Sequence, residues 1–154
     1  SVSKIPQNVN KYAKEWAYRL RDEPVECAKG FNFQKEKIIA ESEVFRGATY
    51  GVSYDLDKNP TNIFVHNHTE KSCLSYMDVI LATYKKIKKI FASSADGYTA
   101  IDFTTVKKGM TKRKMLSFLM NEEYKFSKTL TGFPCKINSE VPIFSSSSFK
   151  FPSI

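Results

Sequence analysis

The sequence has few of the features that mark disulfide frameworks, cysteine metal sites or membrane spans. Its three cysteines, Cys27, Cys73 and Cys135, are far apart and include no C-x-x-C pair. This pattern argues against a disulfide framework and a cysteine zinc site, and it fits a reducing compartment. No apolar run approaches the roughly 18 to 20 residues of a membrane span, and no signal-peptide pattern opens the sequence. We therefore expect a soluble, cytoplasmic protein with no membrane span.

Length and composition predict one globular domain. Of the 154 residues, 42% are hydrophobic and 14% aromatic, which is enough for one core and leaves little room for a second. Charged residues make up 26%, which excludes a highly charged disordered tail. We assign residues 1–138 to the domain and residues 139–154, rich in Ser and Pro, to a C-terminal tail.

The net charge of +8 comes from 24 Lys and Arg against 16 Asp and Glu. Much of the excess lies in residues 85–89 and 107–114. Such clusters can face nucleic acid or an acidic protein, although a solvated face is their more common role. A nucleic-acid partner is therefore possible but not favoured.

Apolar periodicity predicts both helices and strands. Residues 8–22 have helical spacing and end before Pro24, a second helix is predicted over 75–91, and a third after Thr111. Short apolar runs bounded by turn residues predict strands around Phe31 and Phe33, around Ile38 and Ile39, and over residues 48–54 and 62–65. Two further strands are predicted over 90–95 and 98–103, joined by a hairpin at Asp96-Gly97. This order predicts an α+β fold, a central mixed sheet flanked by helices.

The most informative feature is the pair of histidines at the end of the run 62–65. His66 and His68 are the only histidines in the chain. Residues i and i+2 of an extended segment point to the same face, so both imidazoles can bind one ion. Asp78 follows ten residues after His68, at the start of the predicted second helix. Two imidazoles and a carboxylate leave a fourth tetrahedral position for water, the arrangement of a catalytic Zn²⁺ site.

These residues resemble the signature of the JAB/MPN (JAMM) zinc metallopeptidases. That signature is His-x-His, usually followed by Pro, then Ser-x-x-Asp, with a glutamate on an earlier strand. Here His66-Asn67-His68 and Ser75-Tyr76-Met77-Asp78 match it, and the spacing and Asn67 are similar to compact bacterial, phage and RadC-like members. Pro24-Val25-Glu26-Cys27, followed by Gly30, resembles the segment with the glutamate. The resemblance covers roughly residues 10 to 105 and implies the JAB/MPN (cytidine-deaminase-like) architecture.

The resemblance also implies roles for single residues. His66, His68 and Asp78 would bind zinc, Glu26 would act as the general base, and Ser75 would donate a hydrogen bond to the oxyanion. The substrate would be a peptide or isopeptide bond of a protein, often beside the C-terminus of a ubiquitin-like protein. Thr69 stands where the family usually has Pro, which predicts a less rigid loop after the histidines.

Other interpretations of the same residues remain open. Ser75 and Asp78 also form a good helix-capping pair, which would leave Asp78 less free to bind a metal. Glu26 can be a surface carboxylate, and Glu41, Glu43 and Glu23 are alternative bases. The competing functions are a non-catalytic scaffold of the same fold and a RadC-like basic module that associates with nucleic acid.

Overall fold

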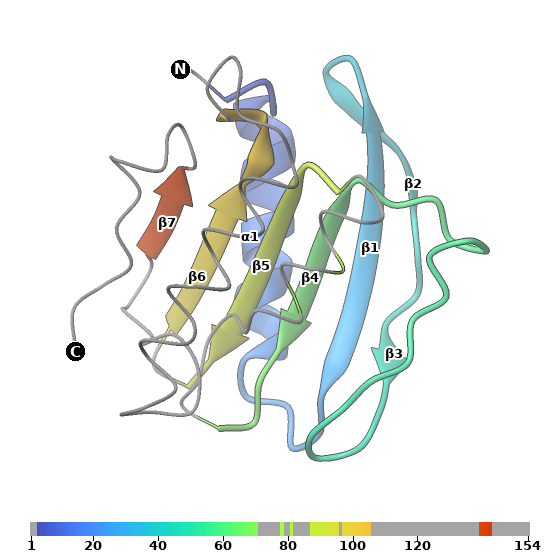
Figure 1. Cartoon of the computed structure of the whole chain (residues 1–154), viewed down its shortest axis with the longest axis vertical. Helices are drawn as coiled ribbons and strands as arrows, with labels where there is room; N and C mark the ends of the chain where they lie inside the picture. Colours follow the sequence, from blue (N-terminus) through green and yellow to red (C-terminus); the bar gives the residue numbers. More distant parts are fainter. Residues whose placement is uncertain are drawn as a thin grey trace.

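A mixed β-sheet with a long helix across one face forms the fold (Figure 1). The structure is a computed structural model that describes residues 3–70, 78, 81, 87–95, 97–105 and 139–142. The strands pair in the order β2-β1-β4-β5-β6-β7, and β3 also pairs with β1. In chain order the elements are α1 (Gln7–Leu20), β1 (Cys27–Gln34), β2 (Lys37–Glu41), β3 (Phe45–Arg46), β4 (Ile63–Asn67), β5 (Lys89–Ser94), β6 (Gly97–Asp102), the 3₁₀ turn η1 (Phe103–Thr105) and β7 (Ser139–Pro142). An α+β fold with a mixed sheet is therefore confirmed; membership of the JAB/MPN architecture remains a prediction.

Helix α1 confirms the helix predicted over residues 8–22, although it ends at Leu20, two residues earlier. Its buried residues are Val9, Ala13, Ala17 and Leu20, which recur every three or four positions and so form one stripe. This stripe packs on the sheet, and its two alanines let the helix backbone lie close to the strands.

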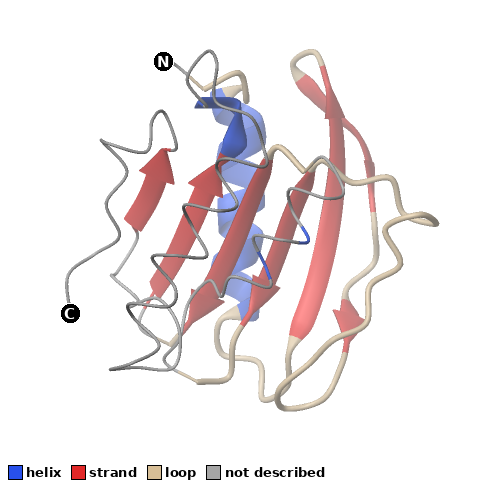
Figure 2. Cartoon of the chain, in the orientation of Figure 1, coloured by secondary structure: helices blue, strands red, loops and turns tan. Residues whose placement is uncertain are grey.

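Buried apolar residues lie on both faces of the sheet, with Phe64, Ile90 and Ile101 on the face away from α1. A hydrophobic core cluster lies between α1 and the other face (Figure 2). Alternate strand residues point to this face because successive side chains of a strand point to opposite sides. The strand residues of the core are Cys27, Phe31 and Phe33 of β1, Ile63 and Val65 of β4, Phe91 of β5, and Tyr98 and Ala100 of β6. The residues between them, such as Ala28 and His66, therefore lie on the opposite face.

Strand β4 is the central strand of the fold. It pairs antiparallel with β1 on one edge and parallel with β5 on the other, and all five of its residues are buried. Parallel neighbours need a crossover connection. Residues 68–88 make this connection, and both Asp78 and Leu81 within it are helical.

The strand predicted over residues 48–54 is wrong. Only an isolated bridge between Ala48 and Gly51 forms there, and it closes a tight turn. The ring of Tyr54 instead packs edge-on against Phe45 and Phe64. Strand β1 already pairs with β2 and β3 on one edge and with β4 on the other, so it offers no free edge to a further strand.

The helix predicted over residues 75–91 extends too far. Ile87 and Lys88 are not helical, and β5 begins at Lys89, so Phe91 is a strand residue. Apolar residues at 87, 90 and 91 fit a helical stripe and a buried strand equally well, and in the structure residues 90 and 91 belong to strand β5. The hairpin between β5 and β6 is confirmed, but Gly97 pairs with Ser94 and thus opens β6 rather than lying in the turn.

Several predictions involve residues that the structure does not describe or describes only in part. The third helix after Thr111 lies outside the described residues. Four residues of the segment assigned to the tail, Ser139–Pro142, form β7, which pairs parallel with β6. Within the described ranges, no helix has the length and apolarity needed to cross a membrane.

Gly47 offers a test of the turn that follows β3. A Cβ at this position would lie 2.1 Å from the carbonyl oxygen of Gly51 and 2.6 Å from Cα of Val52, so the backbone would have to move. We predict that Gly47→Ala lowers the free energy of unfolding by about 1 to 3 kcal/mol, as overpacking does elsewhere. The matched control is Gly51→Ala, since a Cβ there meets nothing within 4 Å. Chemical denaturation of both variants checks this, and equal stabilities would contradict it.

Candidate metal centre

The two histidines lie at the carboxyl end of β4. His66 is the penultimate residue of the strand and is only 3% exposed. His68 follows the strand directly, and its backbone N–H donates to the carbonyl of Ser93 at 2.8 Å, which continues the parallel alignment with β5. Both side chains thus lie on the sheet face opposite α1, and their Nε2 atoms are 3.0 Å apart.

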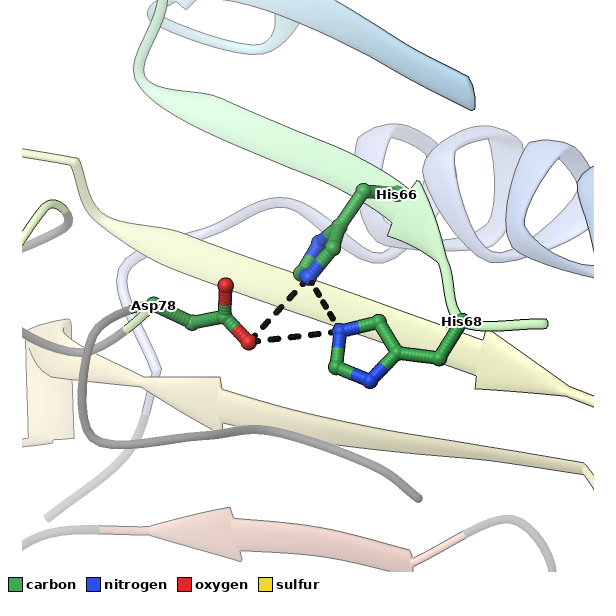
Figure 3. A group of neighbouring side chains, drawn as sticks. All are labelled: His66, His68 and Asp78. Atoms are coloured by element: carbon green, nitrogen blue, oxygen red, sulfur yellow. Dashed lines mark hydrogen bonds and ion pairs between the residues drawn. The ribbon is translucent and has the colours of Figure 1, made fainter. Parts of the chain in front are cut away.

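Asp78 comes to the same point from the crossover between β4 and β5 (Figure 3). Its Oδ2 lies 3.2 Å from Nε2 of His66 and 3.4 Å from Nε2 of His68. Figure 3 shows both rings pointing toward this oxygen. The structure thus brings together the three residues that the sequence predicts as metal ligands.

The triangle of these three atoms fits a tetrahedral metal ion. With bonds of about 2.0 to 2.1 Å to nitrogen and oxygen, the ligand atoms of tetrahedral zinc are about 3.3 to 3.4 Å apart. The three separations here are 3.0, 3.2 and 3.4 Å. Nitrogen and oxygen donors of this kind also suit other divalent ions, so the arrangement defines a possible metal site without fixing the element.

The charges of the site act strongly on one another. Burial of the Asp78 carboxyl opposes its ionisation, but the adjacent imidazoles of His66 and His68 outweigh this and hold the pKa of Asp78 well below its usual range. Burial likewise opposes protonation of His66, yet the carboxylates of Asp78 and Glu26 prevail and raise the pKa of His66. The site therefore stabilises positive charge next to Asp78, as a cation site must.

Glu26 lies just before β1 and next to this cluster. Ala28 pairs with His66 across β1 and β4, so continuing the antiparallel register by two residues brings Glu26 level with His68. Burial raises the pKa of Glu26, and this effect exceeds the opposing influence of the two imidazoles. Its carboxylate is not one of the three converging ligand groups, which suits a base that acts beside a metal.

The alternative glutamates have other surroundings. Glu41 accepts a hydrogen bond from Tyr12 and pairs with Lys29 at 3.2 Å, and the ammonium of Lys29 lies over the ring of Trp16 on the α1 side. Glu23 pairs with Arg46 at 2.6 Å, and Glu43 is exposed. The geometry therefore favours Glu26 among the four candidate bases.

Two neighbours of the histidines have contacts that the sequence did not predict. The hydroxyl of Thr69 donates to the carbonyl of Thr49 at 2.6 Å, so a hydrogen bond ties the loop where a less rigid connection was expected. The amide of Asn67 bonds to the backbone on both sides of Glu26. Ser75, the predicted oxyanion donor, lies outside the described residues.

Comparison of the chain with protein-family models and with curated proteins gives no match. The JAB/MPN resemblance therefore rests on the residues of the site.

We predict that the protein binds about one zinc ion per chain and that Asp78→Asn weakens this binding at least about 100-fold, more than the loss of an outer-shell partner. Asp78 is the one acidic member of the converging group. The matched control is Glu70→Gln, which removes an exposed carboxylate two residues after His68. Chelator competition measures the affinities. If Asp78 only caps a helix, Asp78→Asn keeps its zinc and loses about 0.5 to 2 kcal/mol of stability.

Zinc affinity should fall as the pH falls, because a metal binds neutral imidazole. The pKa of His66 is raised by Asp78 and Glu26, so protons begin to compete with zinc above the usual histidine value of about 6.5. Asp78 stays ionised throughout, since its pKa is lowered. In Glu26→Gln the decline should begin at lower pH, because one of the carboxylates that favour His66 protonation is gone. Chelator competition from about pH 5.5 to 8.5 tests this, and a flat profile would contradict it.

Proposed function

We propose that this chain is a zinc-dependent hydrolase that cleaves a peptide or isopeptide bond, with a conjugate of a ubiquitin-like protein as the substrate class to test first. The observation that supports this most is the convergence of His66, His68 and Asp78 on one point, with the carboxylate of Glu26 beside them. These four residues come from three separate segments. Their meeting at one end of β4 is not required by the hydrophobic cluster under α1, which lies on the other face.

The side chains of the site suit hydrolysis. When bound, zinc supplies Lewis-acid activation of water and of the scissile carbonyl. Glu26 accepts a proton from the attacking water and then delivers it to the nitrogen of the leaving amine, so that its carboxylate is regenerated. Ser75 is proposed to donate a hydrogen bond to the oxyanion, on the basis of the Ser-x-x-Asp motif alone.

Access to the site supports a catalytic rather than a structural metal. Side-chain exposure is 4% for His66, 12% for His68 and 21% for Asp78, so His66 is the most enclosed of the three and the other two keep a small exposed area. Three protein ligands also leave one coordination position free, whereas structural zinc sites have four protein ligands. We propose that a substrate carbonyl reaches the ion from the side of His68 and Asp78, the more exposed ligands.

We predict that Glu26→Gln lowers kcat by about 10² to 10⁴-fold while zinc stays bound, because the base moves protons without holding the metal. The assay uses ubiquitin joined through its C-terminal carboxyl to a fluorogenic amine, together with internally quenched peptides. The matched control is Glu43→Gln, which removes an exposed carboxylate and should leave kcat unchanged.

Other results would point to the competing functions. Zinc binding without turnover of any reporter would favour the non-catalytic scaffold. Salt-dependent binding to DNA with no hydrolysis would favour the nucleic-acid module, since phosphate contacts weaken as salt increases. Full activity of Glu26→Gln would move the role of base to another residue.

A further inference from the structure

The buried amide of Asn67 lies across the backbone on both sides of Glu26. Its Oδ1 accepts from the N–H of Cys27 at 2.6 Å, and its Nδ2 donates to the carbonyl of Val25 at 3.1 Å. Asn67 itself is 0% exposed. The two bonds therefore form in a water-free environment, where they constrain the chain more than exposed bonds do.

The other side of Glu26 is held by the turn after β3. The N–H of Glu26 donates to the carbonyl of Ala48 at 2.9 Å, and its carbonyl accepts from the N–H of Gly47 at 2.7 Å. Glu26 precedes the first residue of β1 and would otherwise belong to the loop that follows α1. Bonds from both sides give this loop position the rigidity of a strand residue.

Asn67 also stands between the two histidines. Successive residues of an extended segment point to opposite faces, so His66 and His68 point to the metal site while Asn67 points away from it. Within residues 66–68, the side chains of His66 and His68 thus face the metal site, and the side chain of Asn67 bonds to the backbone beside Glu26. Residues 66–68 therefore link two of the three proposed metal ligands to the backbone that carries Glu26.

We propose that Asn67 is a positioning residue for the general base Glu26. This inference rests on the proposed function, because it assigns Asn67 a role in proton transfer through Glu26. Misplacing a catalytic group by about 1 Å can lower a rate about 100-fold, so two bonds that fix the backbone of the base matter for kcat.

A purely structural role is the alternative, and the chain contains a matched control for it. Asn62, just before β4, makes a comparable pair of bonds, to the N–H and carbonyl of a single residue near the far end of β1. Its Oδ1 accepts from the N–H of Phe33 at 2.9 Å, and its Nδ2 donates to the carbonyl of Phe33 at 2.8 Å. Asn62→Ala therefore breaks an equivalent clamp at the other end of the same strand pair.

The experiment compares Asn67→Ala with Asn62→Ala in the zinc-loaded full chain, using the reporter that the wild type cleaves fastest. We expect both variants to unfold at a lower temperature. Only Asn67→Ala should lower kcat, by about 10 to 100-fold, with KM within about threefold of the wild type. Zinc affinity by chelator competition should stay within about threefold in both variants, because neither amide contacts a ligand atom.

Three outcomes would overturn the inference. The first is an equal kcat in both variants, the second is a loss of zinc affinity in Asn67→Ala, and the third is an effect of Asn67→Ala that persists in full when Glu26 is already Gln. If the alanine variants do not fold, Asn67→Ser and Asn62→Ser replace them, because a short hydroxyl cannot span both backbone groups. No turnover by the wild type would remove the proposed function itself, and the inference with it.

Discussion

The pairing of β4 with β1 is the constraint on which the geometry of the site depends. Ala28 lies opposite His66 in this pair, and β5 holds the other edge of β4. A slip of one residue would turn His66 into the α1 core and bring Asn67 onto the metal face. Since β4 is buried at every position, such a slip would also exchange its apolar side chains between two packed faces. The hydrophobic pattern of the core therefore sets the position of the histidines.

A buried strand that ends in polar residues needs partners for each of them. Leaving a buried polar group without a partner costs about 1 to 3 kcal/mol, and a charged group costs more. Asn67 bonds to the backbone near β1, and His66 pairs with Asp78. The Nε2 atoms of His66 and His68 lie 3.0 Å apart, and both lie within hydrogen-bond distance of Oδ2 of Asp78. A divalent cation would be held by both nitrogens and the carboxylate at once.

The sequence predicted the elements whose signals are local. The stripe of α1, the alternation in β1 and the β5–β6 hairpin depend on neighbours within a few residues. The prediction failed where pairing between distant segments decides the structure. Residues 48–54 have strand-like composition but pair with no strand of the sheet, and Phe91 fits both the helical and the strand pattern. The histidines were predictable because i, i+2 spacing in an extended segment puts both side chains on one face. Asp78 was predicted from its place at the start of the next helix and from the motif that it completes. The contacts of Asn67 were not, since they join residues 40 and 42 positions apart in the chain and depend on how β1 and β4 align.

Glu23 and Glu26 show why holding a base by its backbone matters. The hydrogen bond from Arg46 lowers the pKa of Glu23, and a carboxylate with a lowered pKa is a weak base. Glu26 is three residues further along, and burial raises its pKa instead. The bonds that fix Glu26 are made by its own N–H and carbonyl and by those of Val25 and Cys27, so its carboxylate need not be paired to be held in place. A group that must accept and release a proton in each cycle requires both a fixed position and an uncommitted carboxylate. Fixing the backbone is the arrangement that satisfies both requirements.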